Sequence, residues 1–290
     1  MDKKRFFASL LFLIVVIGVV LTFSIFRDNY DKKPTLNVLM FHMVTKEMPE
    51  DKDLETLYIT DDMLRRYCEY FKDKYTIVSL DEAYDIIKDN RKVENSNLLA
   101  FTFDDGYDNN YTLAYPILKE FDIHANINII AKYTDENYAG YLTWEQVKEM
   151  SDSDLITFGS HTYNSHYYTE DNDGVETPVL KALLPGESVE ERRNRIFNDL
   201  EMANELISNA TGKHINIMVY PYGVPPVDLM DEIGRRFGYN MQVLVRHGGN
   251  RSVSDFSELK RFTVNGNQDP ENLDKVIKKY NGLNFLEFMK

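Results

Sequence analysis

The sequence predicts an α/β fold in which a parallel sheet is covered by helices. Short, continuous apolar runs alternate along the chain with stretches of helical spacing. Two of the helical stretches begin at residues that suit a helix N-cap, Thr60 and Ser79. The 290 residues are 43% hydrophobic and 13% aromatic, which is enough for a substantial core. This pattern leaves open whether the sheet is open or closed into a barrel.

Each predicted element follows from its local pattern. Eight segments have the length and composition of buried strands: 37–44, 75–80, 98–103, 123–131, 155–160, 215–220, 241–245 and 259–264. Six segments between them have helical spacing: 60–73, 79–90, 113–121, 143–150, 187–207 and 225–238. No internal repeat or domain-scale linker interrupts this alternation, so we expect one domain.

The N-terminus predicts a membrane anchor. Lys3, Lys4 and Arg5 precede an uncharged apolar run over 6–26, which as a helix is about 30 Å long, close to the thickness of a bilayer core. The run lacks the small residues of a cleavage site, which favours an uncleaved anchor over a cleaved signal peptide. The positive-inside rule then places the chain after Arg27 on the extracellular side of the cell membrane. We therefore divide the chain into a cytoplasmic stub and transmembrane anchor (1–27), a tether (28–35) and one domain (36–290).

Charge and cysteine content exclude some functions. The net charge is −14, and it is −17 without residues 1–33, which hold six Lys/Arg and three Asp/Glu. Such an acidic domain argues against nucleic acid and anionic polymers as partners, and it is compatible with a neutral or cationic substrate or product. The single cysteine, Cys68, excludes an intrachain disulfide, and its helical context predicts a buried structural thiol.

Unusual polar residues lie at the ends of the predicted strands. In parallel α/β folds the carboxyl ends of the strands meet at one edge, where functional residues collect. Four predicted strands end in or lead into such residues: His42, the pair Asp104 and Asp105, His161 with His166 five residues on, and Tyr222 within Tyr-Pro-Tyr-Gly.

These residues suit metal-assisted hydrolysis. One carboxylate and two imidazoles form a recurring metal triad that leaves positions for water and substrate. A spacing of five does not place two histidines on one helix face, so His161 and His166 would converge from a strand end and the loop after it. The second aspartate could accept the proton of a water that attacks a carbonyl. Taken singly, Asp-Asp-Gly suits a turn. A lone histidine is more often structural or exposed, and we assign that role to His124, His214 and His247.

Three motifs resemble those of the polysaccharide deacetylases, the NodB-homology fold of carbohydrate esterase family four. They are FTFDDGYDNNY (101–111), SHTYNSH (160–166) and YPYG (220–223), and the resemblance extends over about residues 36–265. It implies a distorted (β/α)7 barrel that removes acetyl groups from N-acetylhexosamine polymers with a divalent metal, typically zinc. Carried onto this sequence, it implies Asp104 as general base, a backbone N–H donor at Tyr222 for the oxyanion, and three metal ligands: Asp105, His161 and His166.

Two departures from the family pattern concern proton transfer. The third motif commonly has an arginine two residues before its proline, and that position is Val219 here. Without an arginine to orient it, Asp104 is predicted to be a weaker base. The late Leu-x-His motif of the general acid is not evident, although His247 is a poorly matching alternative. The early VLMFHMV (38–44) resembles the circularly permuted subfamily, the poly-β-1,6-N-acetylglucosamine deacetylases, and this implies His42 as the general acid.

The segment 167–188 after the second motif is longer than the family usually needs. Thr169 and Leu180 occupy the first and last ligand positions of a calcium-loop pattern, which excludes a standard EF-hand. The segment is either a solvated loop or a wall of a glycan groove in which Tyr167 and Tyr168 stack on sugars.

The sequence thus favours a membrane-anchored, zinc-dependent deacetylase of an extracellular N-acetylglucosamine polymer. Poly-β-1,6-N-acetylglucosamine is the favoured substrate, and peptidoglycan or a chitin oligomer is the alternative. A non-catalytic glycan-binding protein at the cell surface is a second alternative. A phosphotransferase ranks lower because the aspartates lack Asp-x-Asp spacing and no Gly-rich loop accompanies them. A serine hydrolase ranks lower still, because the sequence has no Gly-x-Ser-x-Gly motif.

Overall fold

The computed structural model describes residues 7, 11–22, 24, 34–251 and 256–288, with side chains up to residue 282. Residues 11–22 are helical. Within the described residues, no helix combines the length and the hydropathy needed to cross a membrane. Much of the predicted anchor and most of the tether lie outside the described residues, so both stay predictions.

One sheet of nine strands organises the domain, and two small two-stranded sheets accompany it. The main sheet contains β1 (Thr35–Phe41), β4 (Thr76–Ile77), β5 (Asn97–Phe103), β6 (Ala125–Ile129), β7 (Ile156–Ser160), β10 (Ile217–Val219), β11 (Met241–Val243), β12 (Asn250–Arg251) and β13 (Phe262–Thr263). The small sheets pair β2 (Met43–Thr45) with β3 (Tyr58–Thr60), and β8 (Tyr168–Glu170) with β9 (Glu176–Pro178).

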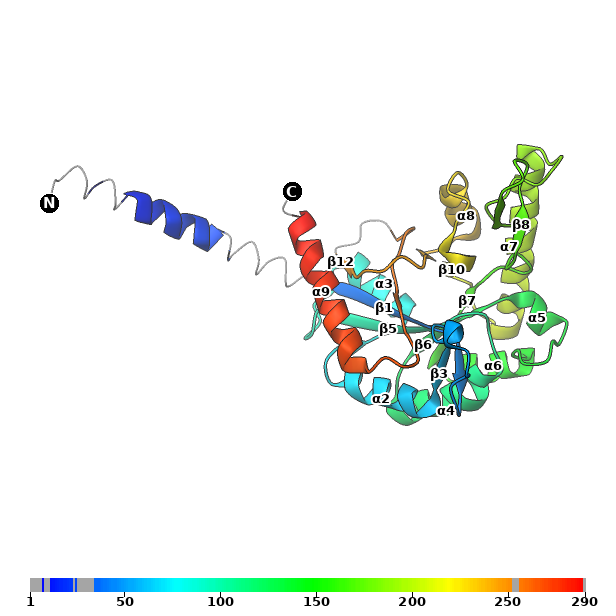
Figure 1. The fold of residues 1–290 in the computed structure, drawn as a ribbon, viewed down its shortest axis with the longest axis horizontal. Coiled ribbons are helices and arrows are strands. Elements are labelled where there is room, and N and C mark those ends of the chain that lie inside the picture. The colour runs from blue at the N-terminus through cyan, green and yellow to red at the C-terminus, as the bar shows by residue number, and fades with distance from the viewer. Residues whose placement is uncertain (1–6, 8–10, 23, 25–33, 252–255, 289–290) are drawn as a thin grey trace.

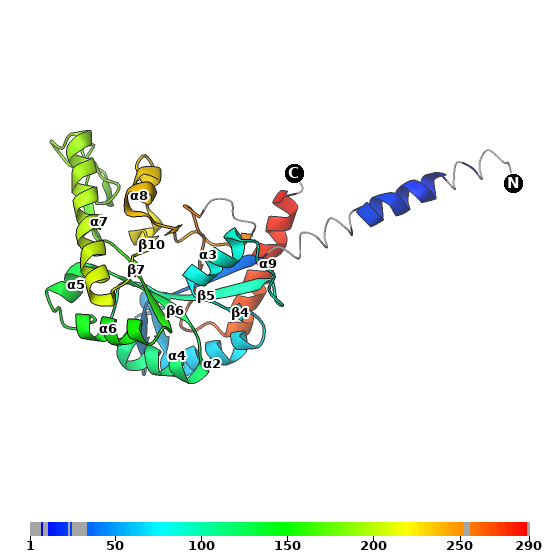
Figure 2. The ribbon, with the colours of Figure 1, turned by 180° about the vertical axis from the view of Figure 1, so that it is seen from behind.

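Helices connect most of the strands. They are α2 (Asp61–Lys72), α3 (Leu80–Lys88), α4 (Tyr115–Phe121), α5 (Ala131–Asp135), α6 (Trp144–Asp152), α7 (Val189–Thr211), α8 (Met230–Phe237) and α9 (Pro270–Phe288). Figure 1 shows α2, α4 and α6 along one side of the sheet, and Figure 2 shows α3 on its other side.

The main sheet is parallel apart from β12 and curls until its two edges meet. Its order is β11-β10-β7-β6-β5-β1-β12, with β13 beside β1 and β4 beside β5. The segment 256–263 exchanges backbone hydrogen bonds with Gln242 of β11 and with Leu244, the residue after this strand's end at Val243. It then runs beside β1 as β13, where Phe262 lies opposite Leu39. One stretch of chain therefore contacts both edges of the sheet.

Alternating side chains divide the core into two clusters. In β5, Leu99, Phe101 and Phe103 pack into the larger cluster with α2, α4, α6 and α7. Leu98 and Ala100 point the other way, into a smaller cluster with α3. This is the two-residue period of a strand buried on both sides. We call the side of Leu98 and Ala100 the inner face.

The helices begin where short polar side chains can cap them. Thr60 accepts the N–H of Met63, and Ser79 accepts that of Glu82, so both predicted N-caps are confirmed. Such caps satisfy backbone donors that have no partner within the helix. Cys68 in α2 is fully buried, as expected of a structural thiol, and burial raises the pKa of its thiol to about 12.

The predicted α/β class is confirmed, and each of the eight predicted strand segments contains an observed strand. The sequence analysis did not predict the terminal helix α9. It also left open a solvated loop at 167–188, where the structure has the β8–β9 hairpin. Both elements are held by contacts with distant residues, which local patterns do not reveal.

Asp274 attaches α9 to the rest of the domain. Its buried carboxylate accepts hydrogen bonds from the hydroxyls of Tyr70 (2.8 Å) and Tyr75 (2.7 Å) and from the ammonium group of Lys278 (2.7 Å). Burial opposes ionisation, but these three donors favour the charged form and hold the pKa of Asp274 below its ordinary value.

Replacing Asp274 with Ala is expected to lower the free energy of unfolding by about 2–4 kcal/mol at pH 7, because charge-assisted bonds are lost and two tyrosine hydroxyls lose their partner. A carboxyl whose pKa is depressed on folding stabilises the protein above its unfolded pKa. The difference between wild type and variant should therefore shrink as the pH falls below the ordinary value of 3.8. Urea unfolding measures this difference in the free energy of unfolding.

The matched control is Asp152→Ala. Asp152 also pairs with a lysine four residues away, Lys148, but both side chains are more than half exposed. Its loss should change the unfolding free energy by no more than about 0.5 kcal/mol. Equal effects of the two substitutions would contradict the role assigned to Asp274.

Candidate metal centre

The inner face changes from apolar to polar at the carboxyl ends of its strands. Phe41 and Phe103 lie opposite each other in the register of β1 and β5. His42 and Asp104 are therefore the next neighbours along these strands, and the Asp104 N–H donates to the Phe41 carbonyl at 2.9 Å. The alternation of β7 turns His161 to the same face, where it is buried. The strand-end site predicted from the sequence is thus assembled by register and alternation.

A left-handed turn separates the two aspartates. Asp105 has φ of 75°, and Gly106 follows with φ of 77°. A non-glycine residue in this region is uncommon and carries a conformational cost, which is typical of functional sites. The turn breaks the strand geometry directly after Asp104, so the two adjacent carboxylates have different partners.

Asp105, His161 and His166 form a group that fits a metal ion. Asp105 Oδ1 lies 3.5 Å from His161 Nε2 and 3.4 Å from His166 Nε2, and all three candidate ligand atoms lie within 4.8 Å of one another. Asp105 Oδ1 is buried and has no hydrogen-bond partner among the described residues. Such an atom is costly to leave unpaired, so it is suited to coordination. One carboxylate and two imidazoles are a common donor set for a divalent transition metal.

The surroundings keep both imidazoles in the form that binds metals. Burial lowers the pKa of His161 to about 3 and also lowers the pKa of His166. Both rings are therefore neutral at pH 7. His161 Nδ1 lies 2.7 Å from the Val219 carbonyl oxygen, which fixes Nδ1 as the protonated nitrogen and leaves Nε2 free to coordinate. Burial raises the pKa of Asp105 to about 6, and a bound cation would favour its ionised form.

Asp104 forms a buried ion pair with Arg261. Guanidinium nitrogens of Arg261 lie 2.9 Å from Asp104 Oδ1 and 2.8 Å from Oδ2, and both side chains are almost completely buried. Asn128 of β6 donates a further bond to Oδ1 at 2.7 Å. Burial is the largest single influence and opposes ionisation of Asp104, but the charge and hydrogen bond of Arg261, together with its other polar neighbours, hold the pKa well below its usual range.

The expectation that Asp104 lacks an arginine partner is therefore wrong. Val219 does replace the arginine before the third motif, but Arg261 reaches the carboxylate from the last part of the sheet. Its Nε donates to the Leu244 carbonyl oxygen at 2.9 Å, which fixes the guanidinium between β11 and β5. The missing motif arginine is therefore not a reason to expect a weak base, although the lowered pKa that Arg261 causes itself makes the Asp104 carboxylate a weaker base than an ordinary aspartate.

A cavity of about 520 Å³ opens over the triad and contains His42. Asp104, Asp105, His161 and His166 also line it. The Nδ1 atom of His42 is buried and has no hydrogen-bond partner among the described residues. His247 does not line this cavity: it is exposed, and its ring lies 6.1 Å from those of Phe262 and Tyr280. Of the two candidate acids, only His42 lies at the site.

The Tyr-Pro-Tyr-Gly segment forms the rim of the cavity. Tyr222 has φ of 58°, and its ring lies 4.5 Å from that of His166. Thr162, between the two metal-ligand candidates, has φ of 73°. Among the described non-glycine residues with positive φ, Thr162 and Tyr222 are the only two that are neither Asn nor Asp. Both strained positions thus belong to the site.

Asp199 of α7 holds the loop between the two histidines. Its carboxylate accepts the backbone N–H groups of Tyr163 (3.0 Å) and Asn164 (2.8 Å), and it also interacts with the Ser165 hydroxyl. This anchors the loop that carries His166 toward His161. Asp199 therefore acts on the triad through the backbone of the loop.

The sequence analysis missed four residues of the site: Asn128, Tyr107, Asp199 and Arg261. The Tyr107 hydroxyl interacts with the Asp105 carboxylate. Asn126 and Asn128 left a detectable signal, because they are polar at every second position of an apolar strand, and so did Arg261, a charge within an apolar strand pattern. Asp199 lies on a long helix among many charged residues, where no sequence signal marks it.

Replacing Asp199 with Ala is expected to weaken divalent metal binding about 10–100-fold, because the loop that positions His166 loses its anchor. Competition with a chromogenic chelator measures the metal dissociation constant. Asp199→Asn keeps one acceptor oxygen, so its metal dissociation constant should lie between those of Asp199→Ala and wild type. Glu201→Ala is the control on the same helix, since Glu201 is exposed and contacts Arg236 at the surface. Unchanged metal affinity in Asp199→Ala would contradict this role.

Comparison with known proteins agrees with this geometry. The polysaccharide deacetylase family model matches residues 91–241, just over half of the chain. The poly-β-1,6-N-acetyl-D-glucosamine N-deacetylase of Escherichia coli K12 is 27% identical over 195 residues, covering 58% of this chain and 28% of that protein. The enzyme of the same name from Staphylococcus aureus MRSA252 is 27% identical over 146 residues, covering 48% of this chain and 46% of that protein. The chain thus spans less than half the length of either curated relative.

Solved structures resemble the fold over most of the chain. A de-N-acetylase from Aggregatibacter actinomycetemcomitans is 25% identical with a TM-score of 0.74, covering 84% of this chain and all of that one. IcaB from Ammonifex degensii is 27% identical with a TM-score of 0.68, covering 84% of this chain and 98% of that one. With the family model matched across the motifs that supply Asp104, Asp105, His161 and His166, the chain belongs to the polysaccharide deacetylase family.

Proposed function

We propose that this protein is a metal-dependent hydrolase that removes N-acetyl groups from N-acetylglucosamine units of an extracellular polysaccharide. The proposal rests on one observation: a group of metal-ligand candidates and an ionised carboxylate lie side by side in one cavity. A metal-ligand triad, Asp105 with His161 and His166, lies beside Asp104, a carboxylate held ionised by Arg261. Hydrolysis of an amide requires both an electrophilic centre and a base within reach of the attacking water.

The triad and the polar residues around it have separate roles in this reaction. Asp105, His161 and His166 would hold a divalent metal, which we propose to be zinc, and this metal would supply Lewis-acid polarisation of the acetyl carbonyl and a lowered pKa for a water. Asp104 accepts the proton of the attacking water, and His42 donates a proton to the departing amine. The backbone N–H of Tyr222 is the proposed donor to the oxyanion. Arg261 and Asn128 position Asp104 and do not contact the reacting atoms.

Poly-β-1,6-N-acetylglucosamine is the substrate we favour, and two observations support it. Relatives from Escherichia coli and Staphylococcus aureus carry that substrate in their names. His42 also directly follows β1, an early position in the chain that the permuted subfamily pattern implies. Peptidoglycan and chitin oligomers are the competing substrates to be tested.

The N-terminal residues are the proposed membrane anchor. We propose that residues 1–27 anchor the protein in the cell membrane with the domain outside, on the strength of the uncharged apolar run and the basic residues before it.

We also assign the fold as a distorted (β/α)7 barrel. The wall of this barrel consists of seven segments: β1, β5, β6, β7, β10, β11 and residues 256–263.

Acetate release by the full-length protein tests the proposal. Release from β-1,6-linked N-acetylglucosamine oligomers should be abolished by a chelator and restored by Zn²⁺, because the triad cannot polarise the carbonyl alone. Parallel assays with β-1,4-linked oligomers and peptidoglycan identify the preferred glycan. Glycan binding without metal-dependent acetate release would favour the non-catalytic alternative.

Replacing His42 with Ala should lower kcat at least about 100-fold, because a general acid typically contributes two to four orders of magnitude. Bound metal, measured by elemental analysis, should remain at the wild-type ratio, since His42 is not part of the triad. His247→Ala is the matched control, and its rate should equal that of wild type. A rate unchanged in His42→Ala would exclude His42 as the acid.

A further inference from the structure

We propose that Tyr168 and Tyr222 form an aromatic subsite that binds a sugar ring of the polymer next to the unit being deacetylated. This inference rests on the proposed function, because it assigns the occupant of a surface continuous with the catalytic cavity. It makes Tyr168 a specificity-determining residue for chain length.

A continuous row of rings leads from the metal-ligand candidates to the hairpin. The ring centroids of His161 and His166 are 5.0 Å apart, and those of His166 and Tyr222 are 4.5 Å apart. Tyr222 in turn lies 4.6 Å from Tyr168 of β8. One ring, that of Tyr222, therefore separates Tyr168 from the triad. At this distance from the triad, Tyr168 would face the sugar unit next to the one being deacetylated.

The outer two rings of this row have free surface. Tyr168 is 48% exposed and Tyr222 is 37% exposed, although each packs against a neighbouring ring. An N-acetylated glycan is neutral, so ionic contacts contribute little to its binding, and the flat apolar faces of its rings remain for recognition. Tyrosine offers such a face together with a hydroxyl for polar contact, at a small entropic cost.

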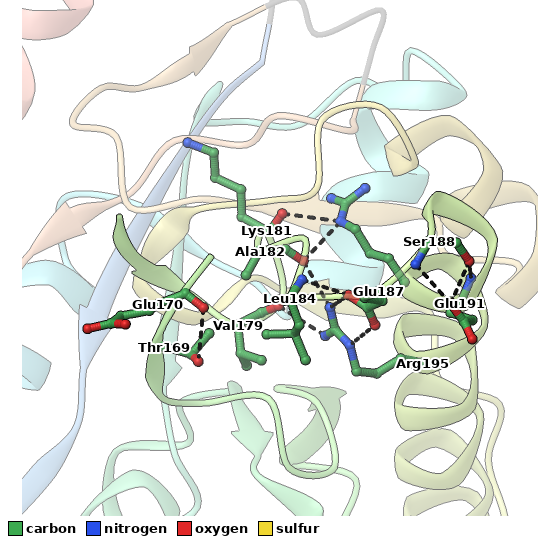
Figure 3. A network of polar contacts seen from close by, with 11 residues as sticks. Thr169, Glu170, Val179, Lys181, Ala182, Leu184, Glu187, Ser188, Glu191 and Arg195 are labelled. Carbon is green, nitrogen blue, oxygen red and sulfur yellow. Dashed lines mark hydrogen bonds and ion pairs between the residues drawn. The ribbon is translucent and has the colours of Figure 1, made fainter. Parts of the chain in front are cut away.

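The segment that carries Tyr168 is held in place before any ligand arrives. Figure 3 shows that Arg195 of α7 donates to the Val179 and Ala182 carbonyl oxygens, at 3.0 and 2.9 Å, and to both carboxylate oxygens of Glu187. Arg192, one turn earlier and buried, donates to the Lys181 and Ala182 carbonyl oxygens and to the carboxylate of Asp228.

These bonds connect the hairpin to α7 and to the loop after Tyr222. The base of the hairpin is also packed, since Val179, Leu180 and Ala182 are buried. The Val179 N–H donates to the Tyr167 carbonyl oxygen at 3.0 Å, which fixes the strand at the residue before Tyr168. A preorganised surface loses little conformational entropy on binding, so its contacts contribute to affinity.

Tyr167 provides an internal control. It is adjacent to Tyr168 and equally exposed, at 47%. Tyr167 directly precedes β8, and successive side chains of extended chain point to opposite sides. Of these two tyrosines, only Tyr168 has a ring contact with Tyr222 among the described residues. An effect of exposed tyrosine in general would appear at both positions, whereas a subsite would depend on Tyr168 alone.

Steady-state acetate release from a series of N-acetylglucosamine oligomers, with the full-length protein, tests the subsite. Tyr168→Ala should raise KM for the longer oligomers about tenfold and leave kcat within about twofold, because it removes binding that is equal in the ground and transition states. KM for the shortest substrate should stay unchanged. Tyr168→Phe keeps the ring and should retain most of the chain-length dependence, and Tyr167→Ala should behave like wild type.

Calorimetric titration of the same oligomers into chelator-treated protein measures binding without turnover. Tyr168-dependent binding in this titration, together with no acetate release by the Zn²⁺-loaded protein, would contradict the proposed reaction and keep the subsite. Acetate release with the same KM series in wild type and Tyr168→Ala, or an equal loss in Tyr167→Ala, would overturn the subsite and keep the reaction. Thermal unfolding monitors folding of each variant, and Tyr168→Leu repeats the measurement if the alanine variant is unstable.

Discussion

The buried ion pair of Asp104 and Arg261 is the interaction on which the rest of the site depends. A carboxylate this deep in the protein would be unstable without a compensating charge. Arg261 supplies that charge and also donates hydrogen bonds to the Leu244 carbonyl oxygen and the Thr102 hydroxyl. Because Arg261 belongs to the segment that contacts β11 and β1, the same pair also secures the meeting of the two sheet edges. Loss of one partner of such a pair typically costs about 3–5 kcal/mol, so the sheet and the site are stabilised together.

Two adjacent carboxylates can be buried here because each has a different kind of partner. Asp104 faces a permanent cation, whereas Asp105 faces two imidazoles that burial keeps neutral. The left-handed turn at Asp105 produces this separation over a single residue. The low pKa of Asp104 and the raised pKa of Asp105 thus come from one local conformation combined with two distant sets of side chains.

The sequence was sufficient for those parts of the structure that local patterns determine. Strand periodicity and strand-end position brought Asp104, Asp105, His161, His166 and His42 together as predicted, since the parallel register aligns the strand ends. Contacts between distant segments were not predictable. Arg261 is 157 residues from its partner Asp104 in the sequence. The absence of an arginine from the third motif therefore predicted that Asp104 has no arginine partner, although Arg261 provides one. The hairpin and α9 escaped prediction for the same reason: the arginines of α7 and the buried Asp274 hold them, and neither contact leaves a local pattern.

The way α7 holds the hairpin has a consequence for sequence divergence. Arg192 and Arg195 bind mainly backbone carbonyl oxygens of the hairpin base, which every residue type provides. Substitutions at the exposed tip, between β8 and β9, therefore leave these attachments intact. The hairpin can change its surface chemistry from one relative to the next, while the catalytic cavity beside it keeps its geometry. Differences in glycan preference among homologues should accordingly concentrate in the exposed side chains of this hairpin, Tyr168 of β8 included, and leave the inner face of the sheet unchanged.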